Sequence, residues 1–459
     1  MESYPQTKMY PHIRDTYTKR FLWTTMASSN EELVKTEILE QTNNLLSKRY
    51  FGLEKNVWAE FMTLAVQHKA VNLGLGFTDY EPPQYFLDIY DETILEHNVF
   101  LHQYTRGFVI EAISNLYSSF FNRQIDPFNE ILVVGGAYAS LFNAIHGLIN
   151  TGDEVIIIEP FFDCYEPMVR SAGGTVRHVA LRPKPESIMQ DISSSSDWIL
   201  DENELDSMFN SHTRLIILNT PNNPLGKVFT LEELKHIAHL CQKHNVICIS
   251  DEVYEWITYD NNKKHIRIAT LPNMWQRTLT IGSAGKTFSS TGLKLGWTIG
   301  PQCLIRLCQI VHQHSVFICP TLSQEVVARC FEYELKRLNS AESYLNSVST
   351  EFLQKRNQFA EVLKECGMRP IVPDGGYFIL AYFSQFANDD RFQSEDNNKK
   401  DFKFVRYLIK EKQLAAIPAS LFYTKNHQYL GENYIRFCFA KKTETLEKAT
   451  RILQTLKIH

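Results

Sequence analysis

The chain lacks the features that would assign it to several large classes of protein. Its apolar runs are only a few residues long, well short of the roughly 20 residues that a membrane-spanning helix needs. It also has no surplus of positive charge, since 47 Lys and Arg face 52 Asp and Glu and the formal net charge is -5. Without a basic surplus there is no general attraction for nucleic acid or for anionic lipid. We therefore expect neither nucleic acid nor a membrane as a partner.

Paired cysteines are missing as well. The nine cysteines are an odd number, none belongs to a Cys-X-X-Cys pair, and several stand inside apolar runs. This pattern favours free thiols in a reducing compartment. No charged segment followed by an uninterrupted apolar core indicates a secretory signal. We expect a cytoplasmic protein, with the mitochondrion as the alternative, because basic residues outnumber acidic ones up to Asn30, as in a transit peptide.

The composition that is present is that of a globular protein of 459 residues, with 44% apolar and 22% charged residues. A chain of this length usually forms one larger and one smaller domain. Residues 1–55 are polar and lack an apolar period, which predicts an appendage: a transit peptide, a poorly ordered tail, or a segment upstream of a start at Met26. We predict an N-terminal arm and small-domain segment over 56–100, a large domain over 101–330 and a small domain over 331–459. The polar stretch 384–401 is predicted to be a surface loop.

Short β-branched runs alternate with helical patterns between about residues 131 and 300. The runs are Ile131-Leu-Val-Val, Val155-Ile-Ile-Ile, Leu215-Ile-Ile-Leu, Val246-Ile-Cys-Ile and Leu279-Thr-Ile. Continuous apolar runs of this length are typical of strands buried on both faces. Between two of them a helix is predicted after Thr230, where Glu233 completes a capping box. The pattern predicts an α/β protein with a mostly parallel sheet between helices.

Residues suited to cofactor chemistry follow the first three runs. In open parallel sheets, ligands bind beyond the carboxyl ends of the strands. Gly135-Gly-Ala-Tyr opens a predicted helix, whose free N–H groups suit a phosphate, although such a turn is commonly structural. The rings of Glu159-Pro-Phe-Phe-Asp suit the face of a planar cofactor, or a hydrophobic core. Asn219-Thr-Pro-Asn-Asn-Pro-Leu-Gly is a turn when taken singly and a candidate site in this series.

The next two runs end in an acid and an amine. Asp251 needs a cationic partner if it is buried, and a protonated pyridine nitrogen would supply one; a surface or salt-bridged aspartate is the alternative. Lys286 lies in a turn of small residues near a second cation, Lys294, which favours loss of its proton and attack on a carbonyl. A solvated surface lysine is the competing interpretation. A nucleotide P-loop is rejected, because Thr280 stands where that motif needs glycine.

Arg436 lies inside the late apolar run Tyr434-Ile-Arg-Phe-Cys-Phe. A buried guanidinium needs an anion, and its planar fork matches a carboxylate. The anion is either a substrate carboxylate or the acid of a structural salt bridge.

Taken together, these stretches resemble those of the fold-type I pyridoxal phosphate aminotransferases, and more closely those of the kynurenine aminotransferase and cysteine-S-conjugate β-lyase family. The resemblance runs from about Asn56 to the C-terminus and adds Val71-Asn-Leu-Gly-Leu-Gly-Phe to the motifs above. It implies pyridoxal 5′-phosphate as the cofactor. The implied fold is a large domain with a mostly parallel sheet of the seven-stranded type, followed by a smaller α+β C-terminal domain.

The resemblance also implies a role for each matching residue. Lys286 would bind the cofactor covalently and then move a proton at the substrate Cα, while Asp251 would keep the ring nitrogen protonated. The other implied cofactor contacts are Tyr254 and Asn223 at the ring oxygen, Phe162 on the ring face, and Ala137, Tyr138, Ser283, Lys294 and Tyr104 at the phosphate. Tyr104 would reach over from a second subunit, which implies a homodimer. The implied substrate contacts are Arg436 and Asn223 at the carboxylate, with Gly76, Trp58, Phe317 and Ile318 lining the pocket.

Two positions depart from the pattern of the type I kynurenine aminotransferases. Ala137 separates the glycine pair from Tyr138, where the type I relatives read Gly-Gly-Tyr, and Ile318 replaces a pocket histidine. An apolar residue at 318 favours bulky apolar or aromatic side chains. We predict an enzyme that passes the amino group of L-kynurenine, and of other aromatic, sulfur-containing or Gln-like amino acids, to a 2-oxo acid. The alternatives are mainly β-lyase or glutamine and aromatic transaminase activity on the same scaffold, and a non-catalytic scaffold that binds pyridoxal phosphate.

Overall fold

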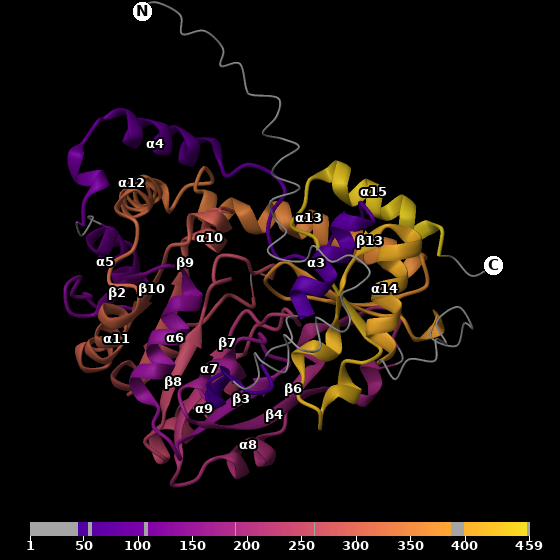
Figure 1. Ribbon diagram of the computed structural model, residues 1–459, viewed down its shortest axis with the longest axis horizontal. Helices are drawn as coiled ribbons and strands as arrows, with labels where there is room; N and C mark the ends of the chain where they lie inside the picture. Colours follow the sequence, from indigo (N-terminus) through magenta and orange to yellow (C-terminus); the bar gives the residue numbers. More distant parts are fainter. Residues whose placement is uncertain are drawn as a thin grey trace, which may run out of the picture.

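The computed structural model describes residues 45–53, 57–104, 109–188, 190–260, 262–386 and 399–456. Within these ranges the chain forms a large sheet, a smaller sheet and the helices around them (Figure 1). The predicted appendage lies almost entirely outside the described residues, as does most of the predicted loop 384–401. In the described ranges, no helix combines the length and apolarity needed to cross a bilayer. The nine cysteines all lie in these ranges, and no disulfide joins any two of them.

The larger sheet has eight strands in the order β2-β10-β9-β8-β7-β3-β4-β6. Its strands are β2 (Ile131–Val134), β3 (Glu154–Glu159), β4 (Thr175–Pro183), β6 (Trp198–Leu200), β7 (Thr213–Asn219), β8 (Ile247–Asp251), β9 (Thr278–Ser283) and β10 (Gly296–Ile299). Neighbouring strands are parallel except that β10 is antiparallel to β2 and β9, and β6 is antiparallel to β4. The five predicted strands are confirmed. The sheet has one strand more than the seven-stranded type, because β6 pairs with the edge strand β4.

Burial explains why the strands of this sheet carry continuous apolar runs. Every residue of β2 and β8 is buried, as expected for strands that are covered on both faces. The helices are α3 (Val57–Gln67), α4 (Gln84–Leu95), α5 (Val109–Phe120), α6 (Ala137–Leu148), α7 (Tyr165–Ser171), α8 (Glu202–Met208), α9 (Leu231–Lys243), α10 (Ala284–Thr287), α11 (Gln302–Ser315), α12 (Thr321–Arg337), α13 (Tyr344–Glu365), α14 (Lys400–Lys412) and α15 (Thr443–Gln454). The predicted capping box begins α9: Glu233 N donates to Thr230 Oγ1 at 3.2 Å, and Thr230 N donates to Glu233 Oε2 at 2.9 Å.

The smaller sheet is formed mainly by strands from the C-terminal part of the chain. Its strand order is β14-β15-β12-β11-β5. The strands are β5 (Ser193–Ser194), β11 (Arg369–Val372), β12 (Phe378–Tyr382), β14 (Ile417–Pro418) and β15 (Tyr434–Cys438). Beside it, β1 (Val71–Asn72) pairs in parallel with β13 (Leu414–Ala415), and α3 packs against α14 (Figure 1). The C-terminal elements β13 and α14 therefore position the segment after β1 at the end of the large sheet. The predicted domain boundaries remain a prediction.

Candidate active site

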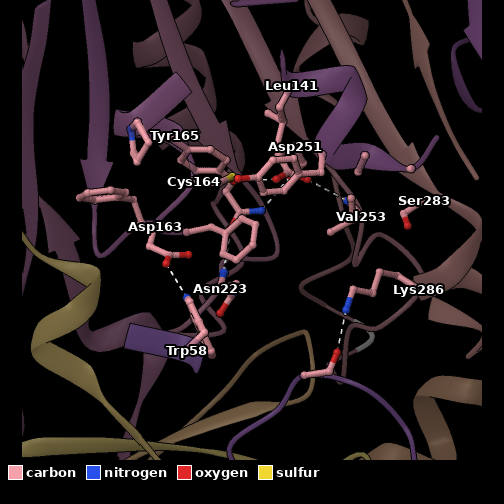
Figure 2. A pocket seen from close by; sticks show the side chains of 18 of the residues that line it. Trp58, Leu141, Asp163, Cys164, Tyr165, Asn223, Asp251, Val253, Ser283 and Lys286 are labelled. Carbon is pink, nitrogen blue, oxygen red and sulfur yellow. Dashed lines mark hydrogen bonds between the residues drawn. The ribbon is translucent and has the colours of Figure 1, made fainter. Parts of the chain in front are cut away.

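A cavity of about 860 Å³ lies beyond the carboxyl ends of the parallel strands (Figure 2). Residues that follow β2, β3, β7, β8 and β9 line it, as expected for an open parallel sheet. The smaller sheet contributes Phe378 and Arg436, and the N-terminal segment contributes Trp58 and Gly76. The cavity is thus built from three separate parts of the chain.

The cavity brings together most of the residues predicted from the sequence. Its lining includes Trp58, Gly76, Ala137, Tyr138, Phe162, Asn223, Asp251, Tyr254, Ser283, Lys286, Lys294 and Arg436. Three predicted residues, Tyr104, Phe317 and Ile318, lie elsewhere and line a second cavity of about 360 Å³. The Tyr104 side chain is exposed, and its ring meets the ring of Phe317 edge-on with centroids 6.0 Å apart.

Asp251 is a buried acid without a basic ion-pair partner in the described ranges. It ends β8, and its Oδ2 accepts a hydrogen bond of 2.6 Å from the Tyr165 hydroxyl. Burial is the largest influence and raises the pKa of Asp251 to about 6, against lowering by Tyr165 and by the N–H of Val253. A cation placed against this carboxylate would restore the ionised form.

Lys286 carries a partly buried amine on α10, the short helix that follows β9. Its Nζ lies 2.8 Å from the carbonyl oxygen of Gly76 and 2.6 Å from the hydroxyl oxygen of Tyr377. Burial lowers the pKa of Lys286 to about 8, which brings the neutral amine within reach near physiological pH. A neutral amine is the nucleophilic form.

The start of α6 offers a site for an anion. Gly136 precedes the helix with φ 90°, and the first N–H groups of the helix have no partner within it. Lys294 lies close to this turn. The distance from its Nζ to a Cβ built on Gly136 would be 3.7 Å. Ser283, at the end of β9, lines the same cavity. A glycine, a helix N-terminus and a lysine together suit a phosphate group.

Arg436 is the cationic counterpart of Asp251. It lies on β15 with 1% of its surface exposed, and its guanidinium donates to Asn223 Oδ1 at 2.8 Å and to the Gly74 carbonyl at 2.9 Å. Its Nε has no partner, and no described carboxylate forms an ion pair with it. Burial lowers the pKa of Arg436 to about 10, which still leaves it charged at neutral pH. The side chain is therefore a buried cation bound only to neutral acceptors.

Sequence reasoning missed three groups in or beside the cavity. Tyr165 binds Asp251, Tyr377 binds Lys286, and Asp163 accepts a short hydrogen bond from the Trp58 indole. Tyr165 and Asp163 belong to the aromatic motif after β3, so their position at a strand end was the available signal. Tyr377 follows a Gly-Gly pair, which did not by itself indicate a role.

A second charged cluster lies behind the site. Glu252, Glu255 and His265 place ligand-type atoms close enough together to suit a metal ion. However, Arg267 pairs with Glu255 in a short contact and lies 3.8 Å from Glu252, so an arginine already supplies the positive charge. We assign no metal to this cluster, and it is best described as a buried ion network under the segment that carries Asp251.

These features fit pyridoxal phosphate on four counts. The unpaired acid suits a protonated ring nitrogen, the neutral amine suits the aldehyde carbon, and the turn before α6 suits the phosphate. Phe162 and Tyr254 supply flat surfaces in the same cavity. The unpaired guanidinium remains for the carboxylate of an amino acid.

Comparison with known proteins gives the same result. The model of the family "Aminotransferase class I and II" matches residues 68–453. Kynurenine–oxoglutarate transaminase 3 of Bos taurus is 51% identical over 412 residues, covering 89% of this chain and 90% of the relative. Kynurenine–oxoglutarate transaminase 1 of Homo sapiens is 44% identical over 419 residues, covering 90% and 99%. The solved structure of Bna3p from Saccharomyces cerevisiae superposes with a TM-score of 0.83 at 34% identity, covering 90% of this chain and 99% of that one.

The family model spans most of the chain, and each of these relatives is more than 30% identical over nearly its whole length. The chain therefore belongs to the class I and II aminotransferases, its fold is that of the fold-type I enzymes, and its cofactor is pyridoxal 5′-phosphate.

Proposed function

We propose that the protein is a homodimeric aminotransferase that takes the amino group from L-kynurenine and passes it to a 2-oxo acid. Other aromatic, sulfur-containing or Gln-like amino acids are further donors. The observation that carries the proposal is a pair of buried, opposite charges in one cavity, Asp251 and Arg436, neither of which forms a direct ion pair with another described residue. The relatives named above support kynurenine as the donor.

Each charge has a place in amino-group transfer. The bound cofactor supplies a ring that accepts the electron pair released when a proton leaves the substrate Cα. Asp251 holds a proton at the ring nitrogen, and the Tyr165 hydroxyl keeps the carboxylate in position. Lys286, with its lowered pKa, would accept the Cα proton and then donate it to a carbon that the bound cofactor supplies. Arg436 and Asn223 bind the substrate carboxylate, which turns the Cα toward Lys286.

The pocket beside Arg436 favours a flat, apolar side chain. The guanidinium lies over the Phe378 ring at 4.0 Å and near the rings of Phe422 and Trp58 at 4.9 Å and 5.2 Å. These rings leave aromatic surface around the carboxylate site. An aromatic donor gains contact area there, whereas a short acidic donor would need a second cation.

A second subunit would complete the site. Tyr104, Phe317 and Ile318 do not line the main cavity of their own chain. The large apolar side chains Val99, Phe100, Tyr104, Val316 and Phe317 are more than half exposed and come from neighbouring parts of the fold. Apolar exposure on this scale marks an interface. We propose that each subunit offers this surface to the main cavity of the other.

A half-reaction tests the donor. Purified protein loaded with cofactor is mixed with L-kynurenine and no oxo acid, while cofactor absorbance and kynurenic acid are followed. We expect one product per site together with loss of the absorbance band. No product with kynurenine or any other amino acid would refute aminotransferase activity, and product with other donors alone would refute the kynurenine assignment. Full turnover by Lys286→Ala would also contradict the proposal. Pyruvate release from a cysteine S-conjugate without an oxo acid would reveal β-lyase activity.

Subunit mixing tests the shared site. Tyr104→Ala and Lys286→Ala each impair every site of their own dimer. A hybrid dimer has one site in which an intact Lys286 meets an intact Tyr104, so unfolding and refolding the two variants together should restore activity. If activity is not restored although sedimentation shows dimers, Tyr104 does not act across subunits.

A further inference from the structure

The amine of Lys286 is held by two oxygen atoms from distant parts of the chain. Its Nζ lies 2.8 Å from the Gly76 carbonyl oxygen and 2.6 Å from the Tyr377 hydroxyl oxygen. The hydroxyl donates to the same carbonyl at 2.9 Å. The three polar atoms form a closed triangle at the edge of the cavity. In Figure 2 a dashed line from Lys286 marks the bond to the carbonyl.

The Tyr377 ring is fixed by packing. It is 3% exposed, and it meets the Tyr254 and Phe378 rings with centroids 5.1 Å and 4.9 Å apart. Phe352 packs on it from α13 at 5.9 Å. A ring held on three sides presents its hydroxyl in one direction, so the triangle does not depend on a mobile side chain.

The protons of this triangle can be counted. A neutral amine has two protons and one lone pair, and a carbonyl oxygen has two lone pairs. The Gly76 carbonyl accepts one proton from Tyr377 and one from Lys286. The hydroxyl oxygen, whose own proton is committed to the carbonyl, accepts the second amine proton. Both amine protons are then bound, and the lone pair of Nζ is left free.

We propose that Tyr377 is a positioning residue, which, together with the Gly76 carbonyl, orients the Lys286 amine whenever that amine is not bonded to the cofactor. This inference rests on the proposed function, because transfer of the substrate Cα proton requires a free amine. In that step the Cα–H bond would break and an N–H bond would form at Nζ, while the electron pair of the broken bond would be taken up by the ring that the bound cofactor supplies. The Tyr377 oxygen and the Gly76 carbonyl accept the two protons that the neutral amine already carries. The third proton, just accepted from the substrate Cα, is therefore the one that Lys286 can donate again.

The charged groups around the amine set its titration. Burial is the largest influence and lowers the pKa of Lys286 to about 8. Arg436 and Lys294 favour the neutral amine, whereas Asp251 and Cys438 favour the charged one. Burial and the neighbouring Tyr254 raise the pKa of Tyr377, so its hydroxyl keeps its proton over the range in which Lys286 titrates.

Tyr377→Phe tests the role through the amine itself. The enzyme is loaded with pyridoxamine 5′-phosphate, the amine form of the cofactor, which leaves Lys286 unbonded. Competitive acetylation over a range of pH, read from the Lys286 peptide by mass spectrometry, then gives the pKa of the amine. We expect a lower pKa in the variant, because a hydroxyl oxygen that accepts from Nζ binds an ammonium more strongly than an amine. A higher pKa would show that the hydroxyl donates to Nζ, and an unchanged pKa would show no contact; either would overturn the proposal.

Single-turnover kinetics supply the second measurement. With a saturating donor carrying deuterium at Cα, Tyr377→Phe should lower the first-order rate constant by roughly 10- to 100-fold and increase the isotope effect, because a misdirected amine slows proton transfer. The donor concentration for half-saturation should change little. An unchanged isotope effect would contradict the assignment.

Tyr259→Phe is the matched control. Tyr259 is a partly buried tyrosine that donates a short hydrogen bond to the carbonyl of Gly376, the residue before Tyr377, and no hydrogen bond joins it to Lys286 among the described contacts. The Tyr259→Phe variant should have the amine pKa and the isotope effect of the wild type. Equal effects in both variants would show that Tyr377 acts only through general packing. Phenylalanine keeps the ring contacts, and thermal unfolding checks that both variants fold. If the wild type turns over no donor, the proposed function fails, while the acetylation result stands by itself.

Discussion

Replacing Arg436 by alanine tests the proposed carboxylate site most directly. The guanidinium donates to two neutral oxygens, Asn223 Oδ1 and the Gly74 carbonyl, and it lies over the Phe378 ring. Because neither acceptor carries a charge, the positive charge of Arg436 remains available to a substrate carboxylate. Alanine removes that charge and both protein hydrogen bonds at once.

The size of the effect follows from the contacts that are lost. Removing one partner of a buried, hydrogen-bonded charge pair costs about 2 to 5 kcal/mol. Since about 1.4 kcal/mol corresponds to a factor of ten, donor affinity should fall by roughly 30- to 4,000-fold. The rate constant at saturating donor should fall less than the affinity, because Arg436 influences proton transfer only indirectly, through the orientation of the bound donor and its charge near Lys286. The loss should therefore appear in the concentration dependence of the half-reaction.

The assay compares two ligands and two variants. Stopped-flow half-reactions with L-kynurenine give the affinity, and binding of the matching amine without a carboxylate should be equal in wild type and Arg436→Ala. Arg369→Ala is the control, since Arg369 stacks over Tyr382 at 4.2 Å in the same sheet and does not line the cavity. Thermal unfolding separates affinity from stability. A folded Arg436→Ala variant that binds kynurenine within about threefold of wild type would refute the carboxylate assignment.

Three further outcomes follow from the buried groups. Burial raises the pKa of Asp251 from 3.8 to about 6. In the cofactor-free protein, ionisation of Asp251 should therefore lower the free energy of unfolding as the pH rises between these two values, and the loss should remain at higher pH. Asp251→Asn removes this cost, and its melting temperature relative to wild type should rise as the pH increases through that window, although it should bind cofactor more weakly. Arg267→Met leaves Glu255 as a buried unpaired charge and should lower the free energy of unfolding by about 3 to 5 kcal/mol, and an unchanged denaturation midpoint would contradict the ion network. Trp58→Phe deprives the partly buried Asp163 carboxylate of its indole donor and should cost about 1 to 3 kcal/mol in the same assay, with a clear coupling energy in a double-mutant cycle with Asp163→Asn.

Groups at the strand ends could be predicted because their position follows from chain order. A buried parallel strand leaves its last residues at one edge of the sheet, so Asn223, Asp251 and Lys286 had to converge once their strands were recognised. The start of α9 was equally local, since Thr230 and Glu233 are three residues apart. Patterns of this kind are readable whatever the tertiary structure.

Contacts between residues far apart in the sequence could not be predicted in this way. Tyr377 and Gly76 are separated by 301 residues, and Trp58 and Asp163 by 105. No sequence motif or hydrophobic period specifies which remote carbonyl or carboxylate a side chain will contact. That contact depends on how the smaller sheet packs against the larger one. Phe317 and Ile318 illustrate the same point, since a position that lines a substrate pocket by resemblance lies outside the main cavity of its own chain.

The segment after β1 links the two sheets through its carbonyl groups. Arg436 donates to the carbonyl of Gly74, Lys286 to that of Gly76, and Lys441 to that of Phe77 at 2.7 Å. Arg436 belongs to the smaller sheet, while Lys286 follows a strand of the larger one. Binding a carboxylate at Arg436 and changing the bonding of Lys286 therefore act on one short piece of backbone. Linkage between two sites is reciprocal. A carboxylate bound at Arg436 should therefore change the free energy of releasing the lysine amine by the same amount as release of the amine changes the free energy of binding the carboxylate.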